Sequence, residues 1–179
     1  RFGAPWPGEN RPVHGEGGIA LWTMTRSDTR FVTISCTMPE ARLGVERECP
    51  LAGDEVTGTT RVVRDAAAPA NPDAMAVEWA EHVTLGDPFL DGAVITAGID
   101  AAWLSGMEPA EVRRFDAEPL GPVDVHAALT MPPASDATPC GDILTSRVVD
   151  GWFRAERADL GRTLEYSWDA DDFPWLCIW

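Results

Sequence analysis

Two of the three histidines, His14 and His82, lie among glycines, carboxylates and aromatic side chains. Histidine is the side chain best matched to moving protons near neutral pH. Glu16 follows His14 by two residues, and Trp79 and Glu81 come shortly before His82. An imidazole beside carboxylate acceptors and an aromatic face would suit acid–base chemistry on a sugar. We therefore take His82 as the first candidate for a catalytic residue.

Plainer interpretations of the same residue types stay open. His126 lies in an alternating stretch and is interpreted as a structural or surface residue. A histidine in a strand is usually a satisfied polar residue, so Glu81 and His82 also fit an exposed pair. The chain has eight tryptophans in 179 residues. Indole faces stack on sugar rings, but they also fill cores.

Charge and composition exclude several classes of partner. The net charge is −15, from 29 acidic and 14 basic residues. Nucleic acids and anionic membranes both select basic surfaces, so neither is expected as a partner. The chain has no lysine, which excludes Schiff-base chemistry on a lysine. No apolar run approaches the roughly 20 residues needed to span a bilayer.

The spacing of the four cysteines matches neither a metal-binding motif nor a redox motif. They are Cys36, Cys49, Cys140 and Cys177, and no pair forms a C-x-x-C motif. We interpret them as free thiols, which favours a cytoplasmic location, and we expect neither a metal nor a cofactor. The chain begins at Arg1 without an initiator methionine, so the sequence leaves open whether a leader was removed.

Alternation of apolar and polar residues predicts an all-β fold with short antiparallel strands. The length favours one domain over residues 1–179. The predicted strands are Ile19–Met24, Arg30–Thr37, Leu43–Cys49, Val56–Arg64, Val123–Thr130, Arg147–Ala155 and Arg162–Trp168. Clusters of turn residues separate them, and few helices intervene, which indicates a sandwich or related sheets. One helical turn is predicted at Glu108–Phe115, and a surface loop at residues 132–140.

The last seven residues predict an apolar strand at which the chain stops. Phe173–Trp179 would leave an open apolar edge, and such edges recruit other chains. We expect either that the natural protein is longer or that a partner covers this strand. A homodimer through this edge is one such arrangement.

Three segments, in order, resemble the aldose 1-epimerase (galactose mutarotase-like) family. The stretch from Trp79 to Leu90, with His82-Val-Thr-Leu-Gly and then Pro-Phe-Leu, is similar to the family's motif around its acid–base histidine. The segment Pro12-Val-His-Gly-Glu16 resembles the family's upstream Pro-x-His-Gly-Glu. Residues 172–179 resemble its late Phe-Pro-Trp-Leu-x-Ile-Trp strand.

The resemblance implies an antiparallel β-sandwich that binds a sugar on one sheet and interconverts the α and β anomers. His82 would protonate the ring oxygen, and His14 would orient it. Trp79 and Trp175 are candidates for stacking, and Glu16, Glu81 and Asp91 for hydrogen bonds to sugar hydroxyls. The family's catalytic glutamate lies in a Met-Glu-Phe-Gly-like segment after the Phe-Pro-Trp strand. The present sequence ends before that segment, so we expect it to be part of a longer chain.

Two other functions remain open. A non-catalytic carbohydrate-binding domain would use the same scaffold, since a fold does not fix a function. A cupin-like metal protein would use His14, Glu16, His82 and His126, although the dense His-x-His cluster of such sites is absent. A sugar phosphate suits the acidic chain less well than a free sugar, but Arg11, Arg113 and Arg114 could bind an anion locally.

Overall fold

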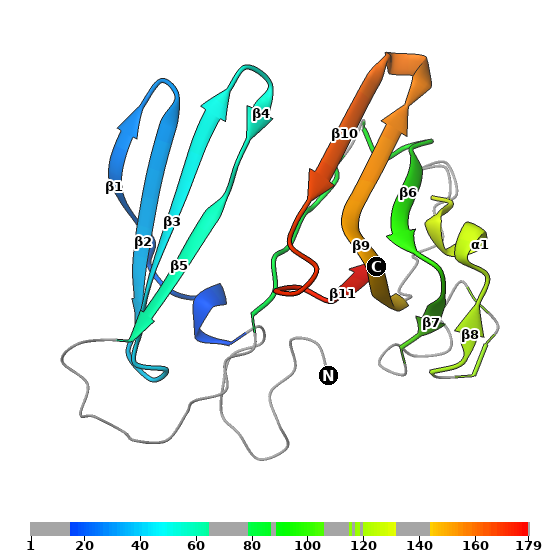
Figure 1. Ribbon diagram of the computed structural model, residues 1–179, viewed down its shortest axis with the longest axis horizontal. Helices are drawn as coiled ribbons and strands as arrows, with labels where there is room; N and C mark the ends of the chain where they lie inside the picture. The colour runs from blue at the N-terminus through cyan, green and yellow to red at the C-terminus, as the bar shows by residue number, and fades with distance from the viewer. Residues whose placement is uncertain are drawn as a thin grey trace. The chain divides into compact units, whose positions relative to one another are not determined.

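The two compact units of this chain are residues 1–76 and residues 77–179, and each has its own sheet (Figure 1). A computed structural model describes residues 15–64, 79–86, 89–105, 115, 117–118, 120–131 and 144–178. These residues form antiparallel β-structure with very little helix, which confirms the all-β class. The prediction of one domain over residues 1–179 stays a prediction.

The first unit contains, within the described residues, a five-stranded antiparallel sheet. Its elements are the 3-10 helix η1 (Glu16–Gly18) and strands β1 (Thr23–Asp28), β2 (Phe31–Met38), β3 (Leu43–Ala52), β4 (Glu55–Val56) and β5 (Thr59–Arg64). Strand β3 is central, with β2 on one edge and β4 and β5 on the other. Cys36 lies opposite Val45 and Met38 opposite Leu43, and all four are buried. The alternation in the sequence therefore marks the covered face at these four positions, whereas Thr33, on the polar side of the alternation in β2, is also buried.

The second unit is organised around one long strand, β9 (Leu144–Arg157). Its other elements are β6 (Val94–Ile99), β7 (Ala102–Leu104), β8 (Pro122–Val123), α1 (Val125–Leu129), η3 (Ala158–Leu160), β10 (Arg162–Ser167) and β11 (Trp175–Ile178). Strands β10 and β11 pair with one edge of β9, and β6 and β7 with the other (Figure 1). Among the described strands, β11 pairs with β9 alone. The predicted C-terminal strand therefore forms, at an edge of its sheet.

Two glycines allow the close approach of chains where β9 changes partners. The register between β6 and β9 shifts between Ala97 and Ile99. A Cβ atom at Gly98 would clash with the carbonyl oxygen of Asp150, and one at Gly151 with the carbonyl oxygen of Trp168. Only glycine fits at such contacts without moving the backbone.

The core of the second unit lies between α1 and the β7–β9 part of the sheet. Leu104 and Ala128 have no exposed surface, and they cluster with Ala102 and Leu144. Helix α1 is capped by Asp124, the residue before it, whose Oδ1 accepts a hydrogen bond from the backbone N–H of Ala127 at 2.8 Å. This cap satisfies one of the donors at the start of the helix, so it stabilises a helix of only five residues.

Several predicted elements differ from the structure. The predicted strand Val123–Thr130 is wrong, because Asp124 caps a helix that buries Ala128 and Leu129. The predicted strand Ile19–Met24 begins too early, since β1 starts at Thr23 and η1 ends just before Ile19. Strands β6 and β7 were not predicted. The predicted loop at 132–140 lies outside the described residues, as does all of the predicted helical turn except Phe115.

Candidate functional site

The segment 79–86, which carries His82, has no regular secondary structure. Within it the half-buried indole of Trp79 donates a hydrogen bond from Nε1 to Oε1 of Glu81 at 3.0 Å. His82 follows directly, and its side chain is exposed. Trp79 and Glu81 are therefore held together, and His82 is the next residue along the chain. An aromatic ring and a carboxylate held in this way can contact a polyhydroxylated ligand.

The other predicted contacts in the second unit lie on different elements. Trp175 begins the edge strand β11 and is 55% exposed, so its ring is accessible to a ligand. Asp91 is exposed and lies in the turn before β6. His126 is exposed on α1, which agrees with a surface position although the predicted strand is wrong.

Glu16 has a structural role in the first unit that the sequence did not predict. Its Oε1 and Oε2 accept hydrogen bonds from the backbone N–H groups of Glu40 and Ala41, at 3.1 and 3.0 Å. These amides belong to the turn between β2 and β3, where Arg42 adopts a positive φ of 55°. The carboxylate therefore stabilises that turn. Its contact with a sugar stays a prediction.

Asp91 lines an open depression on the second unit with a volume of about 500 Å³. Residues around it come from the turn before β6, from β6, from the end of β9 and from η3, and include Val94, Glu156, Arg157 and Asp159. The exposed carboxylates of Asp91 and Glu156 make this depression acidic, and Arg157 contributes the opposite charge.

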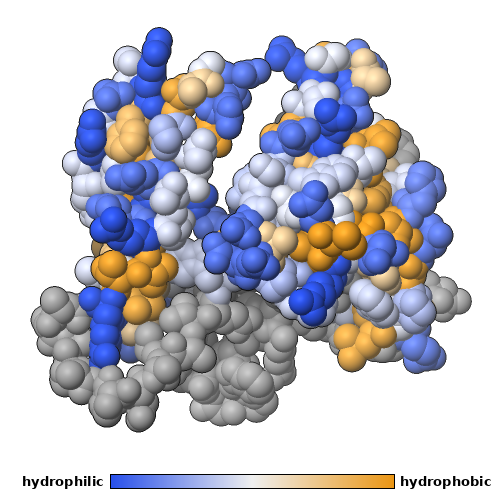
Figure 2. Space-filling model, viewed as in Figure 1, coloured by the Kyte–Doolittle hydropathy of each residue, from blue (hydrophilic) through white to orange (hydrophobic). Residues whose placement is uncertain are grey.

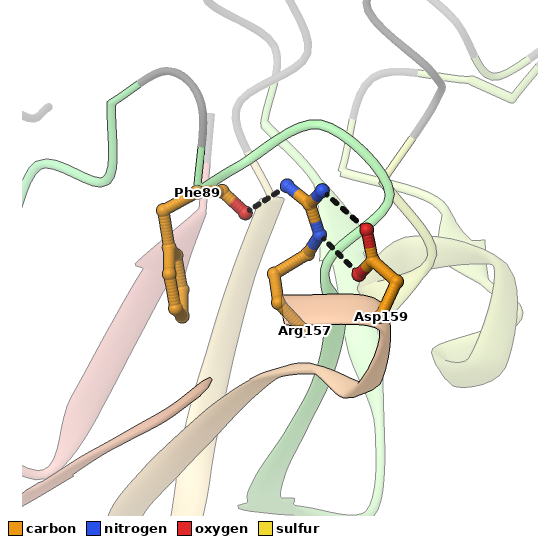
Figure 3. A network of polar contacts seen from close by, with 3 residues as sticks. All are labelled: Phe89, Arg157 and Asp159. Atoms are coloured by element: carbon orange, nitrogen blue, oxygen red, sulfur yellow. Dashed lines mark hydrogen bonds and ion pairs between the residues drawn. The ribbon is translucent and has the colours of Figure 1, made fainter. Parts of the chain in front are cut away.

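Arg157 is the buried charged residue at this depression, with 7% of its surface exposed. Its Nε and Nη2 donate to Oδ1 and Oδ2 of Asp159, each at 2.9 Å, and its Nη1 donates to the carbonyl oxygen of Phe89 at 3.0 Å (Figure 3). The hydrogen bonds from Arg157 hold the pKa of Asp159 below its ordinary value. The same pairing raises the pKa of Arg157.

Sequence analysis did not identify Arg157 or Asp159. Arg157 and Phe89 are 68 residues apart in the chain, and only the pairing of β6 with β9 brings them together. The one local signal is the Arg-x-Asp spacing just after the predicted strand Arg147–Ala155, and such spacing is common on protein surfaces.

The cysteines in the described ranges are free thiols, as predicted. Cys36 is buried, and Cys49 and Cys177 are partly buried. Burial raises the pKa of Cys177 to about 11 and also raises the pKa of Cys36, to which the charge of Glu16 adds. Both thiols therefore stay protonated and weakly nucleophilic near neutral pH.

Some predicted residues lie outside the described ranges. These are His14, Arg11, Arg113, Arg114 and Cys140. Within the ranges given above, no group of three His, Cys, Asp or Glu side chains could hold a metal ion. No helix in those ranges has the length and apolar content that crossing a membrane requires.

Comparison of the chain with protein-family models, with curated proteins and with solved structures found no match.

Proposed function

We propose that this chain binds a small free sugar at a site centred on His82, as an aldose 1-epimerase-like protein. The observation that carries the proposal is the Trp79–Glu81 hydrogen bond beside the exposed His82. The resemblance of residues 79–90 to the family's histidine motif supports it.

The chemistry of a sugar matches this arrangement. A pyranose has apolar C–H faces that pack on an indole ring, and hydroxyl groups that donate to carboxylates. Because the indole N–H already occupies one oxygen of Glu81, the ring and the carboxylate hold each other in place. A ligand therefore meets a partly ordered site, which lowers the entropic cost of binding.

Interconversion of anomers needs an acid and a base on opposite sides of the hemiacetal. His82 would protonate the ring oxygen while a carboxylate removes the proton of the anomeric hydroxyl. The C1–O5 bond then breaks, the C1–C2 bond rotates, and closure of the ring delivers either anomer. Each positioned proton-transfer group typically contributes about 10²- to 10⁴-fold to the rate. His14 would orient the ring oxygen.

A non-catalytic sugar-binding domain is the second candidate. In the resembled family the base is a glutamate in a segment that has no counterpart in residues 1–179. Without a base, binding would persist while exchange of the anomers would be nearly silent. Assays of binding and of exchange therefore separate the two functions.

The proposed fold is a galactose mutarotase-like β-sandwich. Each unit has an antiparallel sheet of its own, and the β2–β3 part of the first sheet buries Cys36, Met38, Leu43 and Val45 on one face. Such a face needs a covering layer, which a sandwich supplies.

Titration with glucose and galactose, followed by tryptophan fluorescence, tests the proposed binding. We expect a saturable change with the wild-type chain, and an affinity at least about tenfold weaker for His82→Ala, because a central polar contact is removed. His126→Ala is the matched control, since His126 is also exposed and lies on α1. Saturation-transfer NMR on the same sugars measures anomer exchange. No fluorescence response and no binding by calorimetry in the wild-type chain would reject the proposal.

A further inference from the structure

Glu16 joins the short helix η1 to the turn between β2 and β3. Both oxygens of its carboxylate are used: Oε1 accepts from the N–H of Glu40 at 3.1 Å, and Oε2 from that of Ala41 at 3.0 Å. A hydrogen bond to a charged acceptor is stronger than one between neutral groups. The two donors lie 24 and 25 positions further along the chain, so this contact ties η1 to a distant part of the same sheet.

The backbone of η1 lies against the covered face of that sheet. A Cβ atom at Gly17 would lie 3.0 Å from Cε of Met38, so the helix passes directly over this side chain. Met38 and Cys36 point to the same face of β2, because they are two residues apart in a strand, and both are buried. Burial raises the pKa of the Cys36 thiol, and the charge of Glu16 raises it further. The carboxylate therefore acts on Cys36 as well as on the turn.

Residues 16–22, which we call the strap, connect η1 to the first strand of the sheet. The carbonyl oxygen of Glu16 accepts from the N–H groups of Ile19 and Ala20, at 3.1 and 3.0 Å, and β1 then begins at Thr23 and pairs with β2. Ile19 is 66% exposed and Leu21 is 91% exposed, so the middle of the strap buries little apolar surface. The strap therefore leaves the sheet at β1 and returns to it at the carboxylate of Glu16.

We propose that the strap is a cover that opens and closes over the Met38 end of the first sheet, and that the carboxylate of Glu16 holds it closed. When both hydrogen bonds break, the strap moves away while β1 stays paired with β2, and Cys36 and Met38 become accessible. Little apolar burial opposes this local opening, whereas unfolding the sheet breaks the whole ladder between β2 and β3. The cover needs no ligand, so it stands apart from the proposed function.

The rate at which Cys36 reacts with iodoacetamide, mapped by mass spectrometry, measures the opening. We expect Cys36 to react at least about tenfold faster in Glu16→Ala than in the wild-type chain, because loss of two charge-assisted hydrogen bonds favours the open form. Glu16→Gln keeps one acceptor oxygen and should react at an intermediate rate. Glu16→Asp keeps the negative charge but has a shorter side chain. A faster reaction in Glu16→Asp therefore reports the opening rather than a changed charge beside the thiol.

Glu40→Gln is the matched control. It removes a carboxylate from the same turn but keeps the backbone N–H that Glu16 binds, so Cys36 should react at the wild-type rate. Cys49, which is partly buried on β3, is the internal control and should react equally fast in every variant. An unchanged Cys36 rate in both Glu16→Ala and Glu16→Asp would overturn the proposal. Equal increases at Cys36 and Cys49 would also overturn it, because they would show general unfolding.

The wild-type chain provides a test that needs no substitution, should the Glu16 variants fail to fold. A local opening lets the amides of Glu40 and Ala41 exchange with deuterium, and lets Cys36 react, at rates that low concentrations of urea hardly change. Amides of the β2–β3 ladder should instead exchange faster as urea is added. If the Cys36 reaction accelerates with urea as steeply as the ladder amides do, the strap does not open separately from the sheet, and the proposal is rejected.

Discussion

At the scale of single residues, Glu16 and Arg157 show how charged groups organise distant backbone. The carboxylate of Glu16 accepts hydrogen bonds from the backbone N–H groups of Glu40 and Ala41. The guanidinium of Arg157 donates a hydrogen bond to the backbone carbonyl oxygen of Phe89. In both cases the backbone segment lies far along the chain from the charged residue. Such bonds satisfy backbone groups that strands do not pair, and they fix loops that carry other side chains. In this chain Arg157 holds the backbone of Phe89 at the end of β9.

The pairing of Asp159 with Arg157 predicts a dependence of stability on pH. The hydrogen bond from Arg157 lowers the pKa of Asp159 in the folded chain below its ordinary value of 3.8. A carboxylate with a lowered pKa stabilises the fold above its unfolded pKa, and this stabilisation is lost as the pH falls through the folded pKa. Asp159→Asn should therefore lower Tm near pH 7, and the difference from wild type should shrink below about pH 4.

Thermal unfolding by circular dichroism, repeated across that pH range, measures this difference. Asp54→Asn, an exposed carboxylate in the first unit, serves as the control and should shift Tm little at any pH. A difference between Asp159→Asn and wild type that is the same at every pH would contradict the assigned pairing.

At the scale of elements, α1 and the β7–β9 part of the sheet depend on each other. The helix is too short to be stable alone, so its cap at Asp124 and its burial against the sheet must hold it. Leu104 on β7 has no exposed surface and belongs to the same cluster as Ala128 of the helix. Packing in this cluster, rather than helix propensity, determines the local structure.

Leu104→Ala should lower the free energy of unfolding by about 2–5 kcal/mol, because it leaves a cavity in a closed cluster. Urea denaturation followed by far-UV circular dichroism measures the change. Leu51→Ala, an exposed leucine in the first unit, is the control and should change stability by less than about 0.5 kcal/mol. Equal effects of the two substitutions would show that this cluster is not a core.

At the scale of the whole molecule, the negative net charge and the exposed apolar surface have opposite effects on association between copies of the chain. The net charge of −15 produces repulsion within the chain. Apolar colour is also visible on the surface of each unit (Figure 2). Leu21, Met24, Val149 and Trp175 are among the exposed large apolar residues. Repulsion between the negative charges disfavours both the folded state and association between copies of the chain. Salt screens this repulsion and should therefore favour both.

Salt should therefore stabilise the fold. Raising NaCl from about 0.01 to about 0.15 M shortens the Debye length from roughly 30 to roughly 8 Å, which screens the repulsion. We expect Tm near pH 7 to rise over this range, as measured by differential scanning calorimetry. Near the isoelectric point of about 4.4 the same salt should have a much smaller effect. A Tm that falls with salt at pH 7 would show that attractive ion pairs outweigh repulsion.

The sequence predicts the all-β class of this fold and part of the covered face of its first sheet. Period-two alternation at residues 43–49 indicates one covered face, because side chains of a strand point alternately to its two sides. In β2 the alternation holds at Cys36 and Met38, but Thr33 on the polar side is buried as well. The same reasoning failed at Val123–Thr130, where Asp124 caps a helix instead. Alternation over a few residues does not distinguish a strand from a short helix, because the surface that buries the apolar side chains comes from elsewhere in the chain.

Which distant groups meet depends on how the strands pair. The types and spacing of Trp79, Glu81 and His82 could be predicted locally, since the three lie within four consecutive residues of the chain. Arg157 and Phe89 could not, because their contact depends on the register of β6 against β9. Register is set by packing and by the close contacts at Gly98 and Gly151, and these exist only once the sheet has formed.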